Sequence, residues 1–457
     1  MHNNSENIFF HHALKIQEDI CSGCTHCMSV CPTQAIRVRG GKAKFISNRC
    51  VDCGECYKVC PVSAITVEQD DFNSILAYKA KVALVPGVLI GQFPEKIHSG
   101  MVYAALLKIG FTHVYEVENS IGFVLKAYER ERELNTLRPL ISSFCPAVIR
   151  LIQVRYPSLV RNIIHVKPPI SMAALYFREK LKYSGYKEEE IGIFYVTPCA
   201  AKIAAVKSPV GEGKSAVTGV INMKFLFNRI NQELRNCPDL EPVELNQELL
   251  SKEGVVWSLT NGEISNVKGR ALAIDGIHNV SEFLDKLENE EIENIDFLEL
   301  RACDQSCAGG ILISGNRFLT VERLGKRAAG FPPIANKALY LKNAPKDDRL
   351  ETILPGSMEK LDEDLSVALK KMEKKRKLMC YLPGFDCAAC GAPDCATLAE
   401  DIVQGFATLS HCIFMQINMQ RNNKLSLNHV FEISEEIWGK DRLNKNCNKI
   451  GAKDENS

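Results

Sequence analysis

The chain has 457 residues, 46% of them hydrophobic, which is enough for about three domains with buried cores. Its 56 Lys and Arg residues balance 55 Asp and Glu residues, so the net charge of +1 does not support nucleic-acid or membrane-surface binding as the main function. No apolar run approaches the roughly 18 residues of a membrane span, and the N-terminal segment lacks the features of a secretory signal. We therefore expect a cytoplasmic protein with no membrane span.

The first predicted domain contains an internal repeat. CSGCTHCMSVCPTQAI begins at Cys21 and CVDCGECYKVCPVSAI begins at Cys50, so every cysteine recurs at an offset of 29 residues. The pattern C-x2-C-x2-C-x3-C-P is typical of two-cluster ferredoxins, in which the fourth cysteine of each run ligates the other cluster. We therefore predict a ferredoxin-like α+β domain with two [4Fe–4S] clusters over residues 16–68. One cluster would be held by Cys21, Cys24, Cys27 and Cys60, and the other by Cys50, Cys53, Cys56 and Cys31.

The other metal that four thiolates commonly bind is zinc. Zinc sites do not usually carry a doubled run with proline after the fourth cysteine, so the spacing favours iron–sulfur clusters. His26 lies within the first run and is expected to be a solvated spacer.

From residue 80 to about 345, short β-rich segments alternate with helical patterns, which predicts a layered α/β domain. Strands are expected at 82–90, 113–117 and 191–196. Residues 96–109 have helical spacing of apolar side chains, and Gly110 is a plausible C-cap.

Residues 346–379 are predicted to form a linker and a charged amphipathic helix. Its apolar stripe consists of Met358, Leu361, Leu365, Leu369 and Met372. A small helical module follows at 380–415, with a helix expected from Ala396 to about Leu409. The tail at 440–457 is polar and expected to be disordered.

The C-terminal module has its own cysteine pattern, Cys387-x2-Cys390-x4-Cys395-x16-Cys412. This pattern resembles the small [4Fe–4S] domain of bacterial electron-transfer proteins such as the B subunit of the Rnf complex. A structural zinc is the alternative, and His411 is an alternative ligand.

Four further cysteines are widely separated in the central region, at Cys145, Cys199, Cys303 and Cys307. Isolated cysteines are often small core residues. Here, however, Pro146 and Pro198 adjoin the first two, and Gly309 and Gly310 follow the last two and allow close backbone approach. We therefore expect these four to be ligands as well. Three cysteines have no predicted ligand role: Cys237, Cys380 and Cys447.

These segments, in this order behind a two-cluster ferredoxin unit, resemble the [FeFe]-hydrogenase superfamily from about residue 16 to residue 330. The added C-terminal module makes the arrangement most similar to the sensory, non-prototypical branches. The resemblance implies a two-lobed α/β domain whose four central cysteines bind a [4Fe–4S] cube. It also implies that Cys307 can bridge to a diiron unit bearing CO, cyanide and an azadithiolate, and that Lys202 hydrogen-bonds a cyanide.

The sequence departs from catalytic members of this family at several positions. The proton-relay cysteine is replaced by Phe144, the following relay glutamate by Ala205, and a methionine near the diiron unit by Arg301. The pocket-lining serine–proline–glutamine stretch reads Pro168, Pro169, Ile170. Because a proton donor must lie within hydrogen-bond reach, losing such a relay costs on the order of 10²–10⁴ in rate.

The two cationic side chains of this region each have two interpretations. Arg301 either pairs with the anionic cluster site or turns outward to an acid such as Glu299. Lys202 either serves a diiron cyanide or is a simple counter-charge to the cube.

The sequence therefore predicts an iron–sulfur electron-transfer or redox/H2-sensing protein of an anaerobe, with four [4Fe–4S] clusters and weak or lost H2 turnover. The alternatives are a slow ferredoxin-linked [FeFe]-hydrogenase, an iron–sulfur assembly or scaffold protein, and a zinc-only interaction protein. The expected partner is a ferredoxin or a signalling or electron-transfer subunit.

Overall fold

The computed structural model describes residues 10–245, 249–334, 344–356, 361–362 and 364–443. The chain is an α/β multidomain protein that divides into two compact units. The first unit comprises residues 1–13, 51–54 and 67–356, and the second comprises 14–50, 55–66 and 357–457. The predicted ferredoxin-like and C-terminal domains thus lie largely in one unit, although some 300 residues separate them.

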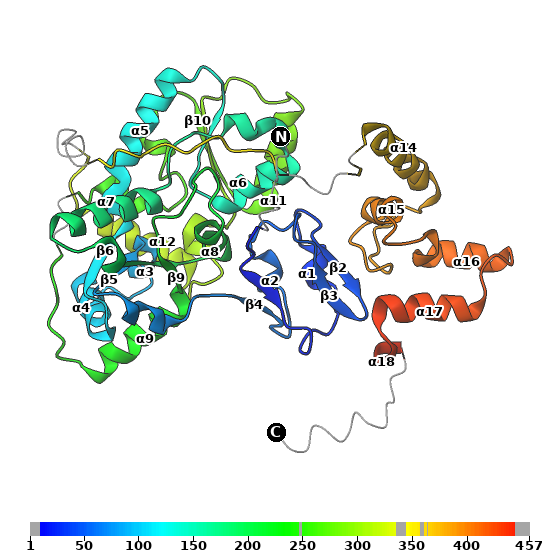
Figure 1. The fold of residues 1–457 in the computed structure, drawn as a ribbon, viewed down its shortest axis with the longest axis horizontal. Helices are drawn as coiled ribbons and strands as arrows, with labels where there is room; N and C mark the ends of the chain where they lie inside the picture. Colours follow the sequence, from blue (N-terminus) through cyan, green and yellow to red (C-terminus); the bar gives the residue numbers. More distant parts are fainter. Residues whose placement is uncertain (1–9, 246–248, 335–343, 357–360, 363, 444–457) are drawn as a thin grey trace, which may run out of the picture. The chain divides into compact units, whose positions relative to one another are not determined.

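The first unit contains a four-stranded parallel sheet in the order β6-β5-β8-β9 (Figure 1). Its strands are β5 (Ala80–Val85), β6 (His113–Glu116), β8 (Ile191–Thr197) and β9 (Gly219–Asn222). Every residue of β8 is buried, as expected for a parallel strand that is covered on both faces. Helices α4 (Ser99–Ile109), α7 (Pro169–Tyr183) and α9 (Met223–Asn236) pack against this sheet.

The strand expected at 82–90 is shorter than predicted. It ends at Val85 because Pro86 cannot donate to the ladder, and Gly87–Ile90 form a turn of helix, α3. The helix expected at 96–109 is α4, and Gly110 ends it with a φ of 126°.

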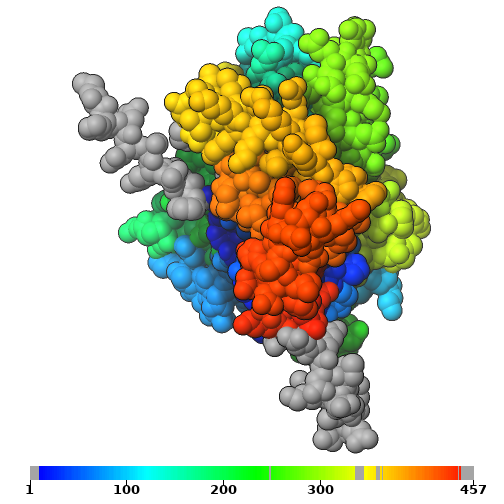
Figure 2. Space-filling view, turned by 90° about the vertical axis from the view of Figure 1, so that its right-hand side faces the viewer, coloured from blue at the N-terminus to red at the C-terminus, as the bar shows by residue number. Residues whose placement is uncertain are grey.

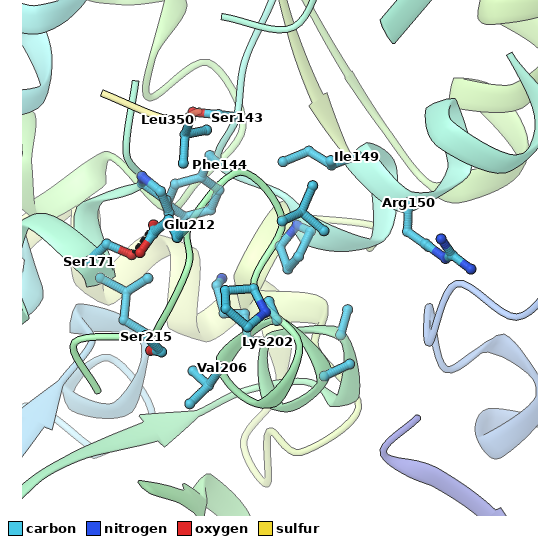
Figure 3. Close-up of a pocket in the computed structure, with 18 of the residues that line it drawn as sticks. Ser143, Phe144, Ile149, Arg150, Ser171, Lys202, Val206, Glu212, Ser215 and Leu350 are labelled. Carbon is cyan, nitrogen blue, oxygen red and sulfur yellow. Dashed lines mark hydrogen bonds between the residues drawn. The ribbon is translucent and has the colours of Figure 1, made fainter. Parts of the chain in front are cut away.

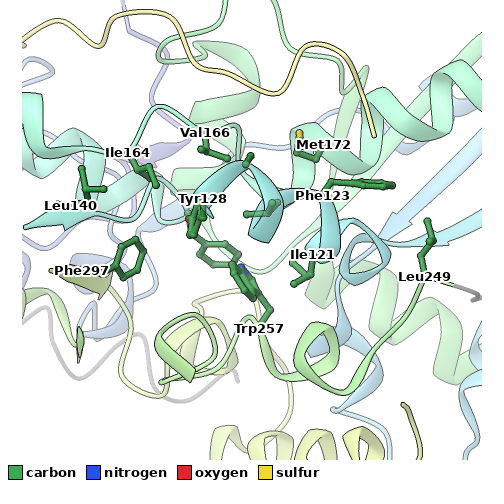
Figure 4. Close-up of a cluster of buried hydrophobic side chains, with 13 residues drawn as sticks. Ile121, Phe123, Tyr128, Leu140, Ile164, Val166, Met172, Leu249, Trp257 and Phe297 are labelled. Atoms are coloured by element: carbon green, nitrogen blue, oxygen red, sulfur yellow. The ribbon is translucent and has the colours of Figure 1, made fainter. Parts of the chain in front are cut away.

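A second parallel sheet in the first unit has the order β10-β11-β7. Its strands are β7 (Leu140–Ile141), β10 (Ala271–Asp275) and β11 (Phe297–Arg301). The core beside it is built on Tyr128, whose ring lies 6.1 Å from Trp257 and 5.5 Å from Phe297 (Figure 4). The remaining helices of this unit are α5 (Ile121–Leu134), α6 (Pro146–Arg155), α8 (Ala200–Lys207), α10 (Lys252–Val256), α11 (Ile277–Glu288) and α12 (Arg317–Ala328).

The ferredoxin-like part pairs β1 (Leu14–Ile16) with β4 (Ile65–Val67) and β2 (Ile36–Arg39) with β3 (Lys42–Phe45). Short helices α1 (His26–Ser29) and α2 (Glu55–Lys58) occupy matching positions in the two repeats. The repeat extends to the backbone, because left-handed residues recur at the same offset as the cysteines. These pairs are Gly23 and Asp52 (φ 62° and 52°), Thr25 and Gly54 (74° and 87°), and Gln34 and Ser63 (53° and 52°).

The C-terminal part of the second unit is helical, and its residues are coloured orange to red in Figure 2. The helices are α14 (Leu365–Tyr381), α15 (Cys395–Gln404), α16 (Ile413–Arg421), α17 (Leu427–Trp438) and α18 (Lys440–Leu443).

Three boundaries differ from the prediction here. The charged helix α14 begins after its N-cap Asp364 and extends to Tyr381, while Met358 lies outside the described residues. The helix expected to reach Leu409 ends at Gln404, because Gly405 takes a left-handed conformation with φ 84°. The expected tail from residue 440 begins with a further helical turn, α18, and residues 444–457 lie outside the described residues.

The predicted apolar stripe of α14 is not buried. Leu365, Leu369 and Met372 are 75%, 53% and 56% exposed. Among the described helices, none combines the length and apolar content that a membrane-spanning helix requires.

Candidate metal centres

The four central cysteines line one cavity in the first unit. Cys145 and Cys199 are the N-caps of α6 and α8, and Cys303 and Cys307 lie in the loop that follows β11. Each therefore lies beyond the carboxyl end of a parallel strand, where ligand sites of α/β sheets are usually built. Four thiols that converge from distant loops around one cavity fit a [4Fe–4S] cube.

The loop that carries Cys303 and Cys307 depends on the glycines that follow. A Cβ on Gly309 would collide with the carbonyl oxygen of Asp304, and a Cβ on Gly310 would meet that of Pro198 at close range. The loop also holds Gln305 with a φ of 60°. The backbone thus folds back tightly on itself to bring the two thiols together.

Electrostatics at this cavity favour an anionic group. Lys202 is 7% exposed, and its Nζ donates to the Sγ of Cys307 at 3.3 Å. Burial alone would lower the pKa of Lys202, but the neighbouring Cys307, Tyr195 and Cys199 outweigh it and raise that pKa. Burial raises the pKa of the Cys199 thiol to about 11, while Lys202 acts in the opposite direction.

The ring of Phe144 lies between two cations. The Cζ of Arg301 is 3.6 Å from the ring centroid, and the Nζ of Lys202 is 4.5 Å from it. Phe144 itself is buried, and Cys145 and Cys307 pack against the hydrophobic cluster to which it belongs. The resemblance predicts a relay thiol at this position, and Phe144 places an aromatic ring without a transferable proton there.

Arg301 pairs with acids, but it does so in the interior, so the outward orientation that we considered is wrong. Its side chain is 2% exposed, with Nη2 at 2.5 Å from Glu263 and Nε at 3.6 Å from Glu299. Burial raises the pKa of Glu299 to about 7, and Arg301 opposes that shift. The hydroxyls of Ser142 and Tyr128 donate to Glu263 at 2.7 Å and 2.9 Å.

Sequence reasoning missed Glu263. It lies in a loop without a motif, and no local pattern distinguishes it from a surface glutamate. Only the folded chain reveals that it is fully buried beside Arg301.

A second cavity lies beside the central one, and Cys307 is the one member of the four cysteines that lines both. Lys202 and Pro198 also border both cavities, and residues 168–170 line the second one. A thiolate shared between two cavities fits a ligand that bridges a cube to a further metal unit.

Sequence reasoning also missed Glu118, which lines this second cavity. Its Oε1 accepts a hydrogen bond from the backbone N–H of Gly87 at 2.7 Å, while its Oε2 is buried with no partner in the described structure. Burial raises the pKa of Glu118 to about 8, and the neighbouring Glu116 adds to the shift. Its position just after β6, at the carboxyl end of a parallel strand, was the available signal.

A third cavity in the first unit has a volume of about 70 Å³ and mostly apolar walls (Figure 3). Phe144 and Lys202 line it, as does Ala205, the position where the resemblance predicts a relay glutamate. Its polar side holds Ser171, whose hydroxyl donates to Glu212 at 2.8 Å.

In the second unit, one cavity is lined by the cysteines of the first predicted tetrad, Cys21, Cys24, Cys27 and Cys60. Burial raises the pKa of Cys27 to about 12, and the other three cysteines add to the shift. The thiol of Cys60, from the second repeat, thus lies with three thiols of the first repeat. Its Sγ accepts from the N–H of Ala64 at 3.2 Å, and Cys31 accepts from Ala35 at the same distance.

The second predicted tetrad is divided between the two units. Cys31, Cys50 and Cys56 belong to the second unit, whereas Cys53 belongs to the first and lines the central cavity there. Its neighbour Asp52 is fully buried and accepts from the N–H of Ala13 at 3.0 Å.

Three of the four C-terminal cysteines are buried together. Cys390, Cys395 and Cys412 share one hydrophobic cluster, and Cys387 is exposed. Burial raises the pKa of Cys390 to about 11, and Cys387 and Cys412 add to the shift. His411 is buried, with its Nδ1 accepting from the N–H of Thr408 at 3.1 Å.

The remaining cysteines stand apart from these groups. Cys380 is exposed on α14, Cys237 contacts Lys108, and Cys447 lies outside the described residues. His26 begins α1 and is exposed.

Three family models match the chain. The iron only hydrogenase large subunit, C-terminal domain, matches residues 79–273, a 4Fe-4S dicluster domain matches 13–61, and a putative Fe-S cluster domain matches 382–414.

Known relatives match with low identity. Iron hydrogenase 1 of Clostridium pasteurianum is 23% identical over 48% of this chain and 38% of its own length. The NADP-reducing hydrogenase subunit HndD of Solidesulfovibrio fructosivorans is 23% identical over 62% of this chain and 47% of its own. The periplasmic [Fe] hydrogenase large subunit of Nitratidesulfovibrio vulgaris is 31% identical over 42% of this chain and 50% of its own length. The chain therefore spans half or less of each of these relatives.

Among solved structures, a variant of the [FeFe]-hydrogenase HydA1 from Chlamydomonas reinhardtii matches with a TM-score of 0.46 and 14% identity. The match covers 61% of this chain and 94% of that one. The chain thus matches the [FeFe]-hydrogenase superfamily over residues 79–273, with an N-terminal ferredoxin-like dicluster domain at 13–61 and a C-terminal iron–sulfur module at 382–414.

Proposed function

We propose that the chain is a redox protein that transfers or senses electrons through four [4Fe–4S] clusters, with weak or lost H2 turnover. The observation that carries the proposal is the placement of Phe144 between Lys202 and Arg301, where catalytic relatives place a proton-relay thiol. The proposed ligands are Cys21, Cys24, Cys27 and Cys60; Cys31, Cys50, Cys53 and Cys56; Cys145, Cys199, Cys303 and Cys307; and Cys387, Cys390, Cys395 and Cys412. When bound, each cluster supplies a one-electron carrier.

The two cations near the central thiols act differently on such a carrier. Lys202 contacts Cys307 directly, and its charge is opposed by no carboxylate within hydrogen-bond distance among the described residues. Arg301 is already balanced by Glu263 and Glu299. Lys202 therefore does more than Arg301 to stabilise the added electron and to raise the reduction potential of the central site.

Proton delivery is where this chain differs from an efficient hydrogenase. Phe144 and Ala205 have no ionisable group, and both line the third cavity, whose walls are mostly apolar. Because general acid–base groups must lie within hydrogen-bond reach of the reacting atom, replacing both relay positions is expected to slow H2 turnover severely.

A second candidate is a slow [FeFe]-hydrogenase. It is favoured by Cys307, which lines both the central and the second cavity, as a bridging thiolate must. In this case Lys202 would hold the diiron unit by a hydrogen bond, and the carboxyl group of Glu118, which lines the second cavity, would be an alternative proton donor.

The test is an iron count, infrared spectroscopy and an H2 assay on protein purified anaerobically after co-expression with hydrogenase maturases. Four clusters of four irons predict about sixteen irons per chain, no CO or cyanide bands and no robust H2 evolution. The matched variant Phe144→Cys restores the relay thiol. If H2 evolution rises at least tenfold in that variant and the infrared bands are present, the slow hydrogenase is correct. Robust H2 evolution by the unaltered protein would refute the primary proposal.

A further inference from the structure

The cysteine loop of the C-terminal module packs directly on the β2–β3 hairpin of the ferredoxin-like part, within the second unit. The N–H of Val38 donates to the carbonyl of Gly391 at 2.9 Å. The Nη1 of Arg39 donates to the carbonyls of Cys390 and Gly391 at 3.3 Å and 3.1 Å. Gly391 has a φ of 73°, and a Cβ there would collide with the carbonyl of Val38, so the two backbones approach as closely as glycine allows.

A buried ion pair fixes α15 on the same hairpin. The Nε and Nη2 of Arg37 donate to the two carboxylate oxygens of Asp401 at 2.7 Å and 3.0 Å, and both residues are 5% exposed. Such a bidentate pair sets orientation as well as distance. Because breaking a buried pair leaves an uncompensated charge, the module is held firmly in place.

Helix α17 contacts both the β2–β3 hairpin and the cysteine loop of the C-terminal module. The N–H groups of Gly40 and Gly41 donate to the carbonyls of Glu436 and Ile437 at 2.7 Å and 2.9 Å. The indole N–H of Trp438 donates to the carbonyl of Ala389 in the cysteine loop at 3.2 Å. The hairpin turn and the cysteine loop are therefore positioned by the same helix.

The module reaches the residues that flank the second predicted tetrad. The side-chain amide of Gln34 donates to Asp394 at 2.6 Å. Gln34 is bonded through its N–H to the carbonyl of Cys31 at 3.1 Å, and Asp394 adjoins Cys395. Arg49, which precedes Cys50, pairs with Glu400 on α15.

The first predicted tetrad makes a different contact. Within the ferredoxin-like part, Lys42 donates to the carbonyl of Cys21 at 2.8 Å. From the C-terminal part, Arg442 contacts the same loop and donates to the carbonyl of Ser22 at 3.0 Å. Arg442 lies in α18, far along the chain from the cysteines of the module.

We propose that the C-terminal cluster exchanges electrons directly with the cluster of Cys31, Cys50, Cys53 and Cys56, through the contact of Gln34 with Asp394. The proposal rests on the four-cluster function above. In the step, one electron leaves the reduced C-terminal cluster and reduces the oxidised second cluster, with no bond or proton transferred. Gln34, Arg37 and Asp401 are positioning residues for this step.

The experiment uses the full chain, reduced with dithionite under anaerobic conditions, and electron paramagnetic resonance at low temperature. Two neighbouring reduced clusters broaden each other's spectra by spin–spin interaction. Cys50→Ser removes the second tetrad and Cys24→Ser removes the first, and each variant is expected to lose about four irons. The broadening of the C-terminal cluster's signal should persist in Cys24→Ser and disappear in Cys50→Ser.

The reverse pattern, or an unbroadened signal in the unaltered protein, would overturn the proposal. Gln34→Leu keeps every ligand and provides a second measurement if the cysteine variants fold poorly. We expect it to keep the iron count of the unaltered protein and to slow electron exchange between the two clusters several-fold. An unchanged exchange rate would also contradict the proposal. A parent protein without four clusters would instead refute the proposed function, so the two failures are distinguishable.

Discussion

Two departures from the family pattern, Phe144 and Arg301, lie against each other in the folded chain. A guanidinium over an aromatic face is attractive by about 0.5–2 kcal/mol, and Lys202 adds a second cation on the same ring. An arginine at this depth also needs negative partners, which Glu263 and Glu299 supply. These residues therefore form one structural set, in which each member depends on the others.

The first prediction concerns that set. Arg301→Met removes the cation and leaves two buried acids without a counter-charge, so it should destabilise the protein by roughly 3–5 kcal/mol. The midpoint of urea unfolding, followed anaerobically by circular dichroism, measures the effect. Adding Glu263→Gln to the same chain should recover much of the loss. A loss of under about 0.5 kcal/mol for Arg301→Met would show that the pair is not buried as described.

The second prediction concerns pH. The raised pKa of Glu118, about 8, means that the folded protein holds a proton that the unfolded chain releases above its lower pKa. The stability that this group contributes is therefore lost as the pH rises toward 8. Glu118→Gln keeps an acceptor for Gly87 and removes the dependence.

Between pH 6 and pH 8.5, the variant should gain on the order of 2 kcal/mol relative to the unaltered protein, measured by urea midpoints. The exposed Glu291 offers a matched control, since Glu291→Gln should show no such pH-dependent gain. Equal behaviour of the two variants would contradict the buried, protonated state of Glu118.

At the scale of elements, the two cysteine repeats are predicted to exchange their fourth ligands. The cavity lined by Cys21, Cys24 and Cys27 is completed by Cys60, which follows α2 in the other repeat. Short loops with paired left-handed residues at a 29-residue offset make the two repeats geometrically equivalent. Equivalence of this kind explains how one short sequence pattern can serve two sites.

The third prediction follows from the exchange. Cys24→Ser combined with Cys60→Ser should cost only one cluster, about four irons, because both residues serve the same site. Cys24→Ser combined with Cys31→Ser should cost about eight irons, because the two residues serve different sites. Iron and sulfide analysis of the purified variants decides between these outcomes. Equal losses in the two double variants would mean that the fourth cysteines do not cross over.

At the scale of the whole molecule, segments that are far apart in the sequence fold into one compact unit. The second unit joins the first ferredoxin-like strands to helices that lie more than 300 residues later. The pair of Arg37 and Asp401, 364 residues apart, is a buried polar link between them. The buried positive charge of Arg37 in the ferredoxin-like part is therefore neutralised by the carboxylate of Asp401 in the C-terminal part.

The fourth prediction is a double-mutant cycle on this pair. Arg37→Leu and Asp401→Leu should each destabilise the protein, and the double variant should lose less than the sum, with a coupling of about 0.5–3 kcal/mol. Thermal or urea unfolding of the anaerobic protein provides the values. Lys286 and Glu282, an exposed pair on α11, offer a control cycle whose coupling should be much smaller, because solvent screens their charges. Additive losses for the buried pair would contradict the link.

The sequence alone determined the features that depend on local covalent geometry. Cysteines that lie close together in the sequence can reach one site from a single loop. The repeat, the C-terminal pattern and the family resemblance can therefore be identified from the sequence without a structure. Local signals also placed α4 and β8, whereas element ends were less well predicted, because Pro86 and Gly405 stop their elements early.

The tertiary structure decided which distant groups meet. No local pattern indicates that Glu263 neutralises Arg301, that Glu118 borders the second cavity, or that Arg37 pairs with Asp401. Such pairings are set by how complete sheets and helices pack, because a buried charge must find its partner among all the residues that packing brings near.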